Sequence, residues 1–147
     1  MKILIISPGK GHDSTVAEGI AEYSKRLPKK FALEWAFPNP KSKEVEGEAI
    51  VKLLKEGDYI VLTDERGKDI DTPGFAKLLD MHLQSGTKRL VFIIGGAFGV
   101  SQDIKQRASV VIKLSSLVFP HMLARLILAE QLYRASSILD GGKYHHA

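Results

Sequence analysis

Residues 91–100, VFIIGGAFGV, join a short apolar run to three glycines. Such a run ending in glycine is typical of a strand that is buried on both faces. Two interpretations of the glycines remain open: a tight turn that needs positive φ, or a backbone without side chains that packs against a flat ligand. A P-loop is excluded because no Gly-Lys-Ser/Thr follows, and the dinucleotide fingerprint is excluded because the stretch follows the fourth predicted strand and lacks G-x-G-x-x-G.

Around this stretch, strand and helix patterns alternate along the whole chain. The sequence predicts strands at 2–7, 31–37, 58–63, 89–94 and 109–114, and helices at 14–27, 43–56, 72–85, 101–106 and 120–139. Most of the strands are near-continuous apolar runs, which parallel strands covered by helices require. We therefore predict an α/β fold, a mainly parallel sheet with helices on both faces, in one domain over 1–147.

Three local details accompany this prediction. Ser14, Thr72 and Ser101 are the expected caps of their helices. The helix at 43–56 is expected to turn Val45 and Ile50 inward, together with Ala49, Leu53 and Leu54. The segment 64–68, DERGK, is expected to form a polar turn after the third strand.

Composition narrows the function only slightly. The formal charge of +4, from 21 basic and 17 acidic residues, permits an anionic partner such as RNA without requiring one. The chain has no cysteine, which excludes disulfides, cysteine zinc sites and thiol nucleophiles, and we expect no metal. The apolar run at 3–6 is too short for a signal peptide or a membrane span, so we expect a cytoplasmic protein with no membrane partner.

Ligands of parallel sheets bind beyond the carboxyl ends of the strands, which directs attention to three loops at 63–68, 95–100 and 115–120. The first loop offers a carboxylate and a guanidinium for acid–base work, or is a solvated turn. The third leads to Pro120, where a helix begins with unpaired backbone N–H groups that favour an anion or a polar ligand group.

The last helix and the tail carry further polar residues. His121 and Arg125 share one face of the helix, and Glu130 and Arg134 share another. The helix is otherwise apolar nearly all round, which predicts one side against the sheet and the other against a second subunit. The terminal KYHHA, 143–147, is either a frayed end or tag remnant, or a tail that folds over a site with titrating groups.

Four segments are informative in combination: GGAFG at 95–99, LVFPH at 117–121, AEQLYRA at 129–135 and Tyr144-His145. With them the chain resembles the ribosomal RNA large subunit methyltransferase H family, of the SPOUT class, over essentially its whole length. The resemblance implies a C-terminal trefoil knot, a homodimer and S-adenosylmethionine bound in the knot loops. It also implies methyl transfer to N3 of a pseudouridine in an intersubunit stem-loop of large-subunit rRNA, on assembled ribosomes.

The same resemblance assigns roles to residues. Leu62 and Thr63 would line the cofactor pocket and Gly96 would lie against the cofactor, while adenine would be wrapped by Ser115, Ser116, Leu117, Val118, Phe119 and Pro120. Tyr144 and His145 would sit near the transferred methyl and the target base. His145 is the first candidate for the base that removes the N3 proton, before Asp64 and Glu65. Many relatives carry a basic residue where this chain has His146, which is only partly charged near neutral pH.

Two rival interpretations stay open. One is a SPOUT methyltransferase that acts on another RNA position, because the target nucleotide comes from the resemblance alone. The other is a noncatalytic RNA- or nucleotide-binding factor in ribosome assembly. An enzyme needs both the cofactor loops and the Tyr144-His145 tail, whereas a binding module does not need both.

Overall fold

The computed structural model describes residues 1–39, 42–95 and 99–146, which form a five-stranded sheet. The strands are β1 (Lys2–Ile6), β2 (Ala32–Ala36), β3 (Tyr59–Asp69), β4 (Arg89–Ile94) and β5 (Val110–Lys113). They lie in the order β2-β1-β4-β3-β5, and all four pairings are parallel. The predicted fold class is confirmed, and the trefoil knot stays a prediction.

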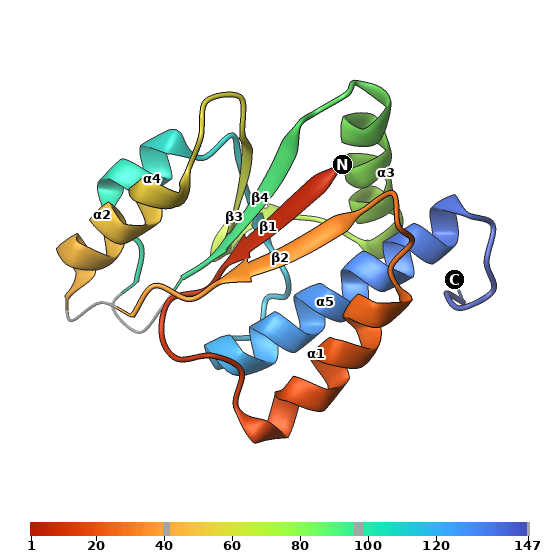
Figure 1. The fold of residues 1–147 in the computed structure, drawn as a ribbon, viewed down its shortest axis with the longest axis horizontal. Helices are drawn as coiled ribbons and strands as arrows, with labels where there is room; N and C mark the ends of the chain where they lie inside the picture. The colour runs from red at the N-terminus through yellow and green to blue at the C-terminus, as the bar shows by residue number, and fades with distance from the viewer. Residues whose placement is uncertain (40–41, 96–98, 147) are drawn as a thin grey trace.

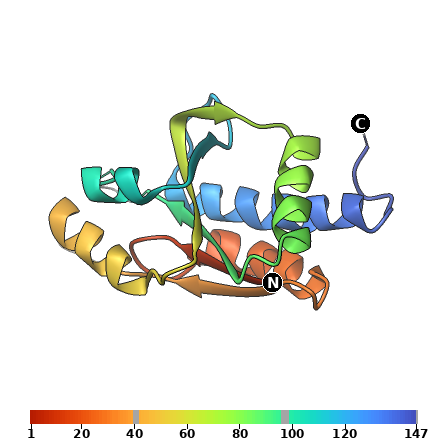
Figure 2. The ribbon, with the colours of Figure 1, turned by 90° about the horizontal axis from the view of Figure 1, so that it is seen from above.

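Helices cover both faces of the sheet (Figures 1 and 2). One face carries α1 (Ser14–Arg26), α3 (Thr72–Gln84) and α5 (His121–Leu139), and the other carries α2 (Lys43–Leu53) and α4 (Gln102–Arg107). Neighbouring residues of β1 alternate between the two cores, with Ile3 and Ile5 on the α3 and α5 side and Leu4 and Ile6 on the α2 and α4 side. The strands are apolar throughout because both of their faces are buried.

Helix caps differ from prediction at two places. Asp13 caps α1, where its side chain accepts a hydrogen bond from the Thr15 N–H at 3.1 Å. Asp71 caps α3 in the same way, accepting from the Gly74 N–H at 2.8 Å. Both aspartates stand one residue before the expected Ser14 and Thr72, and a carboxylate at that place also favours the positive end of the helix dipole. The predicted cap Ser101 is confirmed.

The third strand is longer than predicted. β3 continues to Asp69, and its pairing with β5 shifts so that Thr63 and Lys68 both stand opposite Ile112. The prediction that a polar turn ends the third strand is therefore wrong, because residues 64–67 form an irregularity within one strand. A Cβ on Gly67 would lie 2.6–2.8 Å from backbone atoms of Ile112, so only glycine permits this close approach.

The orientation of α2 also differs from prediction. The helix ends at Leu53, Val45 is 49% exposed and Glu46 is buried. A Cβ on Gly47 would lie 2.6 Å from Ser101 Oγ, so this glycine marks the line of closest approach to the start of α4. That approach turns Glu46, Gly47 and Ile50 inward and leaves Val45 in solvent.

Helix α5 lies between α1 and α3 against the sheet (Figure 1). Its buried positions include Leu128, Ala129 and Leu132, so packing within one chain accounts for much of its apolar surface. Leu123 remains 39% exposed near the start of the helix. Packing within the chain therefore leaves less of this helix for the predicted second subunit to cover than the sequence suggested.

Candidate functional site

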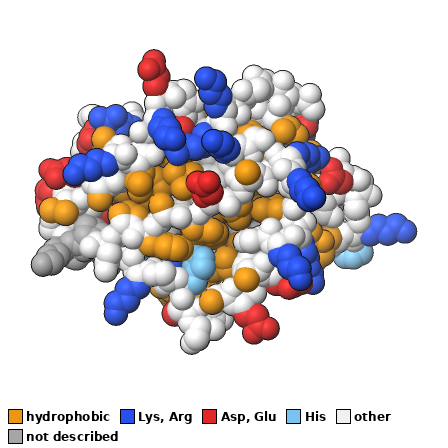
Figure 3. Space-filling view, in the orientation of Figure 1, with side chains coloured by type: hydrophobic (Ala, Val, Ile, Leu, Met, Phe, Trp, Pro, Cys, Tyr) orange, Lys and Arg blue, Asp and Glu red, His pale blue; other side chains and the backbone are white. Residues whose placement is uncertain are grey.

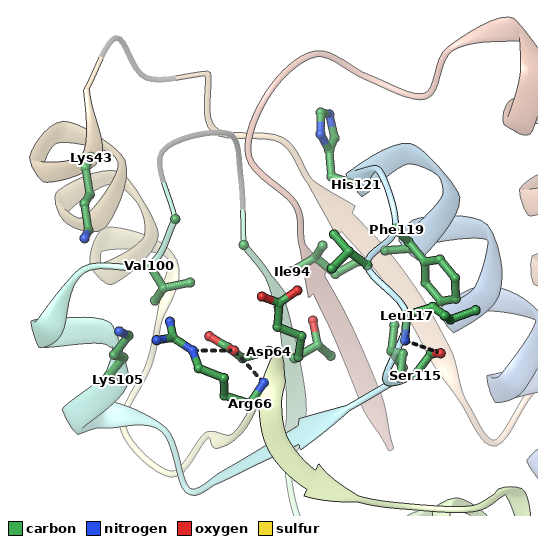
Figure 4. Close-up of a pocket in the computed structure, with 17 residues that line it drawn as sticks. Lys43, Asp64, Arg66, Ile94, Val100, Lys105, Ser115, Leu117, Phe119 and His121 are labelled. Carbon is green, nitrogen blue, oxygen red and sulfur yellow. Dashed lines mark hydrogen bonds and ion pairs between the residues drawn. The ribbon is translucent and has the colours of Figure 1, made fainter.

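A pocket of about 530 Å³ opens beyond the carboxyl ends of β4 and β5, beside the irregularity within β3 (Figure 4). It is lined by parts of all three predicted loops, at 63–66, 95, 99–100, 115 and 117–119, by the strand-end residues Ile94 and Leu114, and by Lys43, Lys105, His121 and Ala124 from helices. Parts of the three predicted loops therefore meet at one pocket, and its use as a ligand site stays a prediction. The volume lies in the range of small-molecule and cofactor sites, about 300–1,000 Å³.

The two sides of the pocket differ in chemistry (Figure 4). Lys43 of α2 and Lys105 of α4 stand on one side, whereas Leu117 and Phe119 stand on the other. Between them, Asp64 accepts a hydrogen bond from the Arg66 N–H at 2.9 Å and also lies 3.5 Å from the Arg66 Nε. The pocket therefore suits a ligand with an apolar or aromatic end and a charged end that carries both signs.

The loop at 115–120 is held at its base by serines. Ser115 Oγ accepts a hydrogen bond from the Leu117 N–H at 3.0 Å, and Ser116 Oγ accepts one from Lys113 Nζ at 3.0 Å. Leu117 and Val118 are 72% and 77% exposed. A short, anchored loop that presents apolar side chains to solvent leaves surface for a ligand or a second subunit to cover.

The predicted cofactor residues divide into three groups. Those that line the pocket are Thr63, Ser115, Leu117, Val118 and Phe119. Leu62 does not, because it is 1% exposed and packs in the core beneath α2 and α4; Ser116 and Pro120 belong to the loop without lining the pocket. The predicted Gly96 lies outside the described residues.

Comparison with known proteins shows which family the chain belongs to. A family model described as a predicted SPOUT methyltransferase matches residues 1–145. The chain belongs to the SPOUT methyltransferase family. It is 40% identical to a protein of Parabacteroides distasonis over 99% of both chains, and 44% identical to one of Synechococcus sp. over 99% of this chain and 95% of that relative. A relative from Trichlorobacter lovleyi is 38% identical over 99% and 100%. All three are named ribosomal RNA large subunit methyltransferase H, so the resemblance is confirmed.

In this SPOUT protein the tail lies on the side of α5 away from the pocket. Tyr144 donates its hydroxyl to Glu130 Oε1 at 3.1 Å, and Arg134 Nη1 lies 3.3 Å from His145 Nδ1. Glu130 and Arg134, expected to share a face of the helix, form an ion pair, with Nε 2.7 Å from Oε1. Glu130 stands about 13 Å along the helix axis from His121 and roughly half a turn around it. Neither tail residue lines the pocket of its own chain.

The environment of the tail determines the protonation state of Tyr144. The pKa of Tyr144 is raised, first by its hydrogen bond with Tyr23 and then by burial and by Glu130. Its phenol therefore stays protonated near neutral pH and serves as a hydrogen-bond donor.

Among the residues of the site region that the sequence did not predict, three are charged. Lys43 and Lys105 line the pocket from helices, and charged residues on exposed helix positions carry no signal that distinguishes them from a solvated surface. Arg125 is fully buried, although its position four residues after His121 had suggested only a shared face. The signal available for Arg125 was its place inside an otherwise apolar run, which is unusual for a guanidinium.

The described part of the chain offers neither a metal cluster nor a membrane span. Within residues 1–39, 42–95 and 99–146, no group of three or more His, Asp or Glu side chains is arranged to hold a metal ion. No helix in those ranges is both long and apolar enough to cross a bilayer.

His12 should make the stability of the fold depend on pH. Burial, and next the Arg125 guanidinium, lower the pKa of His12 in the folded state, against the opposing effect of Asp13. Because the pKa of His12 is lower in the folded state, folding favours its neutral form. The stability that His12 contributes to the fold is therefore fully present above about pH 6.5 and is lost as the pH falls toward the folded-state pKa. We expect the free energy of unfolding in urea to fall between pH 7.5 and 5.5, and to fall less in His12→Gln. Equal slopes would contradict this assignment. The pKa of His82 is also lowered by burial, so His82 adds to the loss of stability at low pH equally in the wild type and in His12→Gln.

Proposed function

We propose that this chain is an S-adenosylmethionine-dependent rRNA methyltransferase that works as a homodimer. The proposed target is N3 of a pseudouridine in an intersubunit stem-loop of large-subunit rRNA, methylated on assembled ribosomes. A ribosomal substrate implies a cytoplasmic protein. The relatives' names and the family support transfer of a methyl group to rRNA, and the sequence resemblance supports the specific nucleotide.

The observation that carries this proposal is the pocket at the strand ends. Leu117 and Phe119 offer apolar surface for an adenine ring, and Lys43 and Lys105 stand where they can attract a carboxylate (Figure 4). Asp64 and Glu65 can attract an ammonium group. A Cβ on Gly95 would already lie 3.1 Å from Val100 Cγ2, so bulk at this strand end narrows the pocket. These residues fit S-adenosylmethionine, which supplies an electrophilic methyl group when bound.

The placement of the tail supports the homodimer. His145 and Tyr144 face away from the pocket of their own chain, on the opposite side of α5. If the tail takes part in transfer, it must reach the pocket of a partner subunit. The exposed Leu117, Val118 and Leu123 lie at the pocket end of the chain and provide apolar surface that a second copy would bury.

The protein contributes orientation and proton removal. The pocket holds the donor so that its methyl faces the target base, and such positioning supplies much of the rate of a group transfer. A guanidinium only donates hydrogen bonds, so in the contact with Arg134 the free lone pair of neutral His145 lies on Nδ1 and the ring proton on Nε2. His145 therefore takes the N3 proton at Nδ1, after its ring leaves this contact with Arg134. Tyr144 donates a hydrogen bond beside it, and general-base catalysis of this kind is worth about 10²–10⁴-fold.

The surface charge favours recognition of an assembled RNA site over tight binding to any RNA. In Figure 3, Lys and Arg side chains surround a band of hydrophobic surface and are interspersed with Asp and Glu, instead of forming one basic patch. With a net charge of only +4, few phosphates can be neutralised at once. Affinity should therefore depend on the shape of the folded RNA and its surroundings.

The direct test is methyl transfer from labelled S-adenosylmethionine to intact 70S ribosomes and to isolated subunits, followed by mapping of the modified nucleoside. We expect label in large-subunit rRNA at N3 of one pseudouridine, with intact ribosomes as the better substrate. Label at another position would support the alternative SPOUT specificity. Binding to ribosomes without any label, by a protein that calorimetry shows to be folded, would support the noncatalytic assembly factor.

A further inference from the structure

Arg125 is a buried cation without a carboxylate partner among the described residues. It is 0% exposed, and the ion pairs formed within 1–39, 42–95 and 99–146 do not include it. Its guanidinium donates to Ser7 Oγ at 2.6 Å and to the Lys10 carbonyl at 2.9 Å, with longer contacts to the carbonyls of Ser7 and Pro8 and to His12 Nδ1. It also lies over the Phe37 ring, 4.7 Å from the centroid.

All of these polar partners belong to the β1–α1 loop, residues 7–12, which follows the carboxyl end of β1. The loop is fixed in turn to the end of β2, because the Ser7 N–H donates to the Ala36 carbonyl at 3.0 Å and the Gly9 N–H to the Pro38 carbonyl at 2.7 Å. One side chain therefore ties α5 to the ends of two strands. Burial removes the charge of Arg125 from water at a cost in free energy, and an apolar side chain would fill this core position without that cost.

The position of Arg125 suggests why a guanidinium is retained. Its neighbour Ala124 lines the pocket, and His121, one turn earlier, stands at the pocket rim (Figure 4). The β1–α1 loop passes over the same turn, since a Cβ on Gly9 would lie 3.7 Å from His121 Nε2 and 3.9 Å from Arg125 Nη2. Gly9 has φ of +115°, a conformation suited to glycine. The first turn of α5 thus lies between the β1–α1 loop and the pocket.

We propose that Arg125 is a positioning residue for the methyl-donor pocket. By anchoring the β1–α1 loop it fixes the first turn of α5, and with it the pocket wall formed by His121 and Ala124. This inference rests on the proposed function, because it names the residue that sets the geometry of the same site. A guanidinium suits this role because its planar fork can donate to Ser7, Lys10 and His12 at once, which a lysine ammonium cannot do from one point.

The test compares Arg125→Lys with Arg89→Lys as the matched control. Arg89 is also largely buried, but it pairs with Asp58 and the Leu53 carbonyl at the amino end of β4, far from the pocket. We expect both variants to lower the melting temperature. Only Arg125→Lys should weaken S-adenosylmethionine binding in calorimetry, by about tenfold or more, because small displacements in a binding site are costly. In methyl transfer, KM for the donor should rise while KM for ribosomes changes by less than about twofold.

Donor affinity of Arg125→Lys within about twofold of wild type, at a temperature where both proteins are folded, would overturn the proposal. Should Arg125→Lys not fold, Ser7→Ala removes the nearest acceptor and leaves the arginine in place. It should weaken donor binding by several-fold, and unchanged affinity would again overturn the proposal.

Amide hydrogen exchange gives a readout that does not need the donor. Exchange should accelerate in residues 7–12 and 121–124 of Arg125→Lys but not of Arg89→Lys. Wild-type protein that binds no donor would instead count against the proposed function.

Discussion

Gly95→Val should abolish detectable S-adenosylmethionine binding and methyl transfer while leaving a folded protein. Gly95 ends β4 and lines the pocket, and its added Cβ would meet Val100 Cγ2 at 3.1 Å. Two further methyl groups must then either displace Val100, which is itself part of the pocket wall, or enter the pocket. We expect calorimetry to show at least about a hundredfold loss of donor affinity, equivalent to about 2.8 kcal/mol.

Two variants make this result interpretable. Ala21→Val adds methyl groups on the exposed face of α1 and should bind the donor like wild type. Gly95→Ala introduces the Cβ alone and should show an intermediate affinity. Wild-type affinity in Gly95→Val, with a melting temperature close to wild type, would remove this strand end from the cofactor site.

Deletion of residues 143–147 should leave donor binding intact but greatly slow methyl transfer. The deletion removes Tyr144 and His145 but leaves the pocket and the Glu130–Arg134 pair, so donor affinity and melting temperature should remain close to wild type. The rate of methyl transfer should fall by about 10²–10⁴-fold, the usual contribution of a general base. Single-turnover transfer to ribosomes measures this loss directly.

Point variants identify which tail residue matters. His145→Gln should lose most of the activity, whereas Tyr144→Phe, which removes only a hydrogen-bond donor, should lose less. Lys143→Ala, at an exposed position before the pair, should retain the wild-type rate. Full activity in the deletion variant would mean that the tail is a frayed end with no part in transfer.

The sequence was sufficient to predict the fold class and the loops of the site because both depend on local patterns. Continuous apolar strands predicted a parallel sheet, and the carboxyl ends of such strands predicted which loops would meet. The prediction failed where distant backbone contacts decide the outcome. The register shift at 64–67 depends on the close approach of Gly67 to Ile112, and the rotation of α2 depends on the approach of Gly47 to Ser101. Neither approach can be inferred from the residues around the glycine.

The site was predictable to a similar extent. Thr63 and Ser115 were assigned by motif and line the pocket, whereas Leu62 is part of the core beneath it. Lys105 and the buried Arg125 escaped prediction, because their roles follow from which helix packs beside which strand end. The motif also assigned Tyr144 and His145 to the site, and a single chain keeps both away from its own pocket. That separation makes the subunit composition of the site the central question.

The most direct measurement mixes the two inactive variants. Gly95→Val carries an intact tail and a blocked pocket, and the 143–147 deletion carries an intact pocket and no tail. After subunit exchange, a mixed dimer contains one complete site if the pocket of one chain is served by the tail of the other, so equal mixing should restore about a quarter of the wild-type methyl transfer. Recovery at that level would establish a site shared between subunits. No recovery, in a sample where native mass spectrometry shows mixed dimers, would contradict the account.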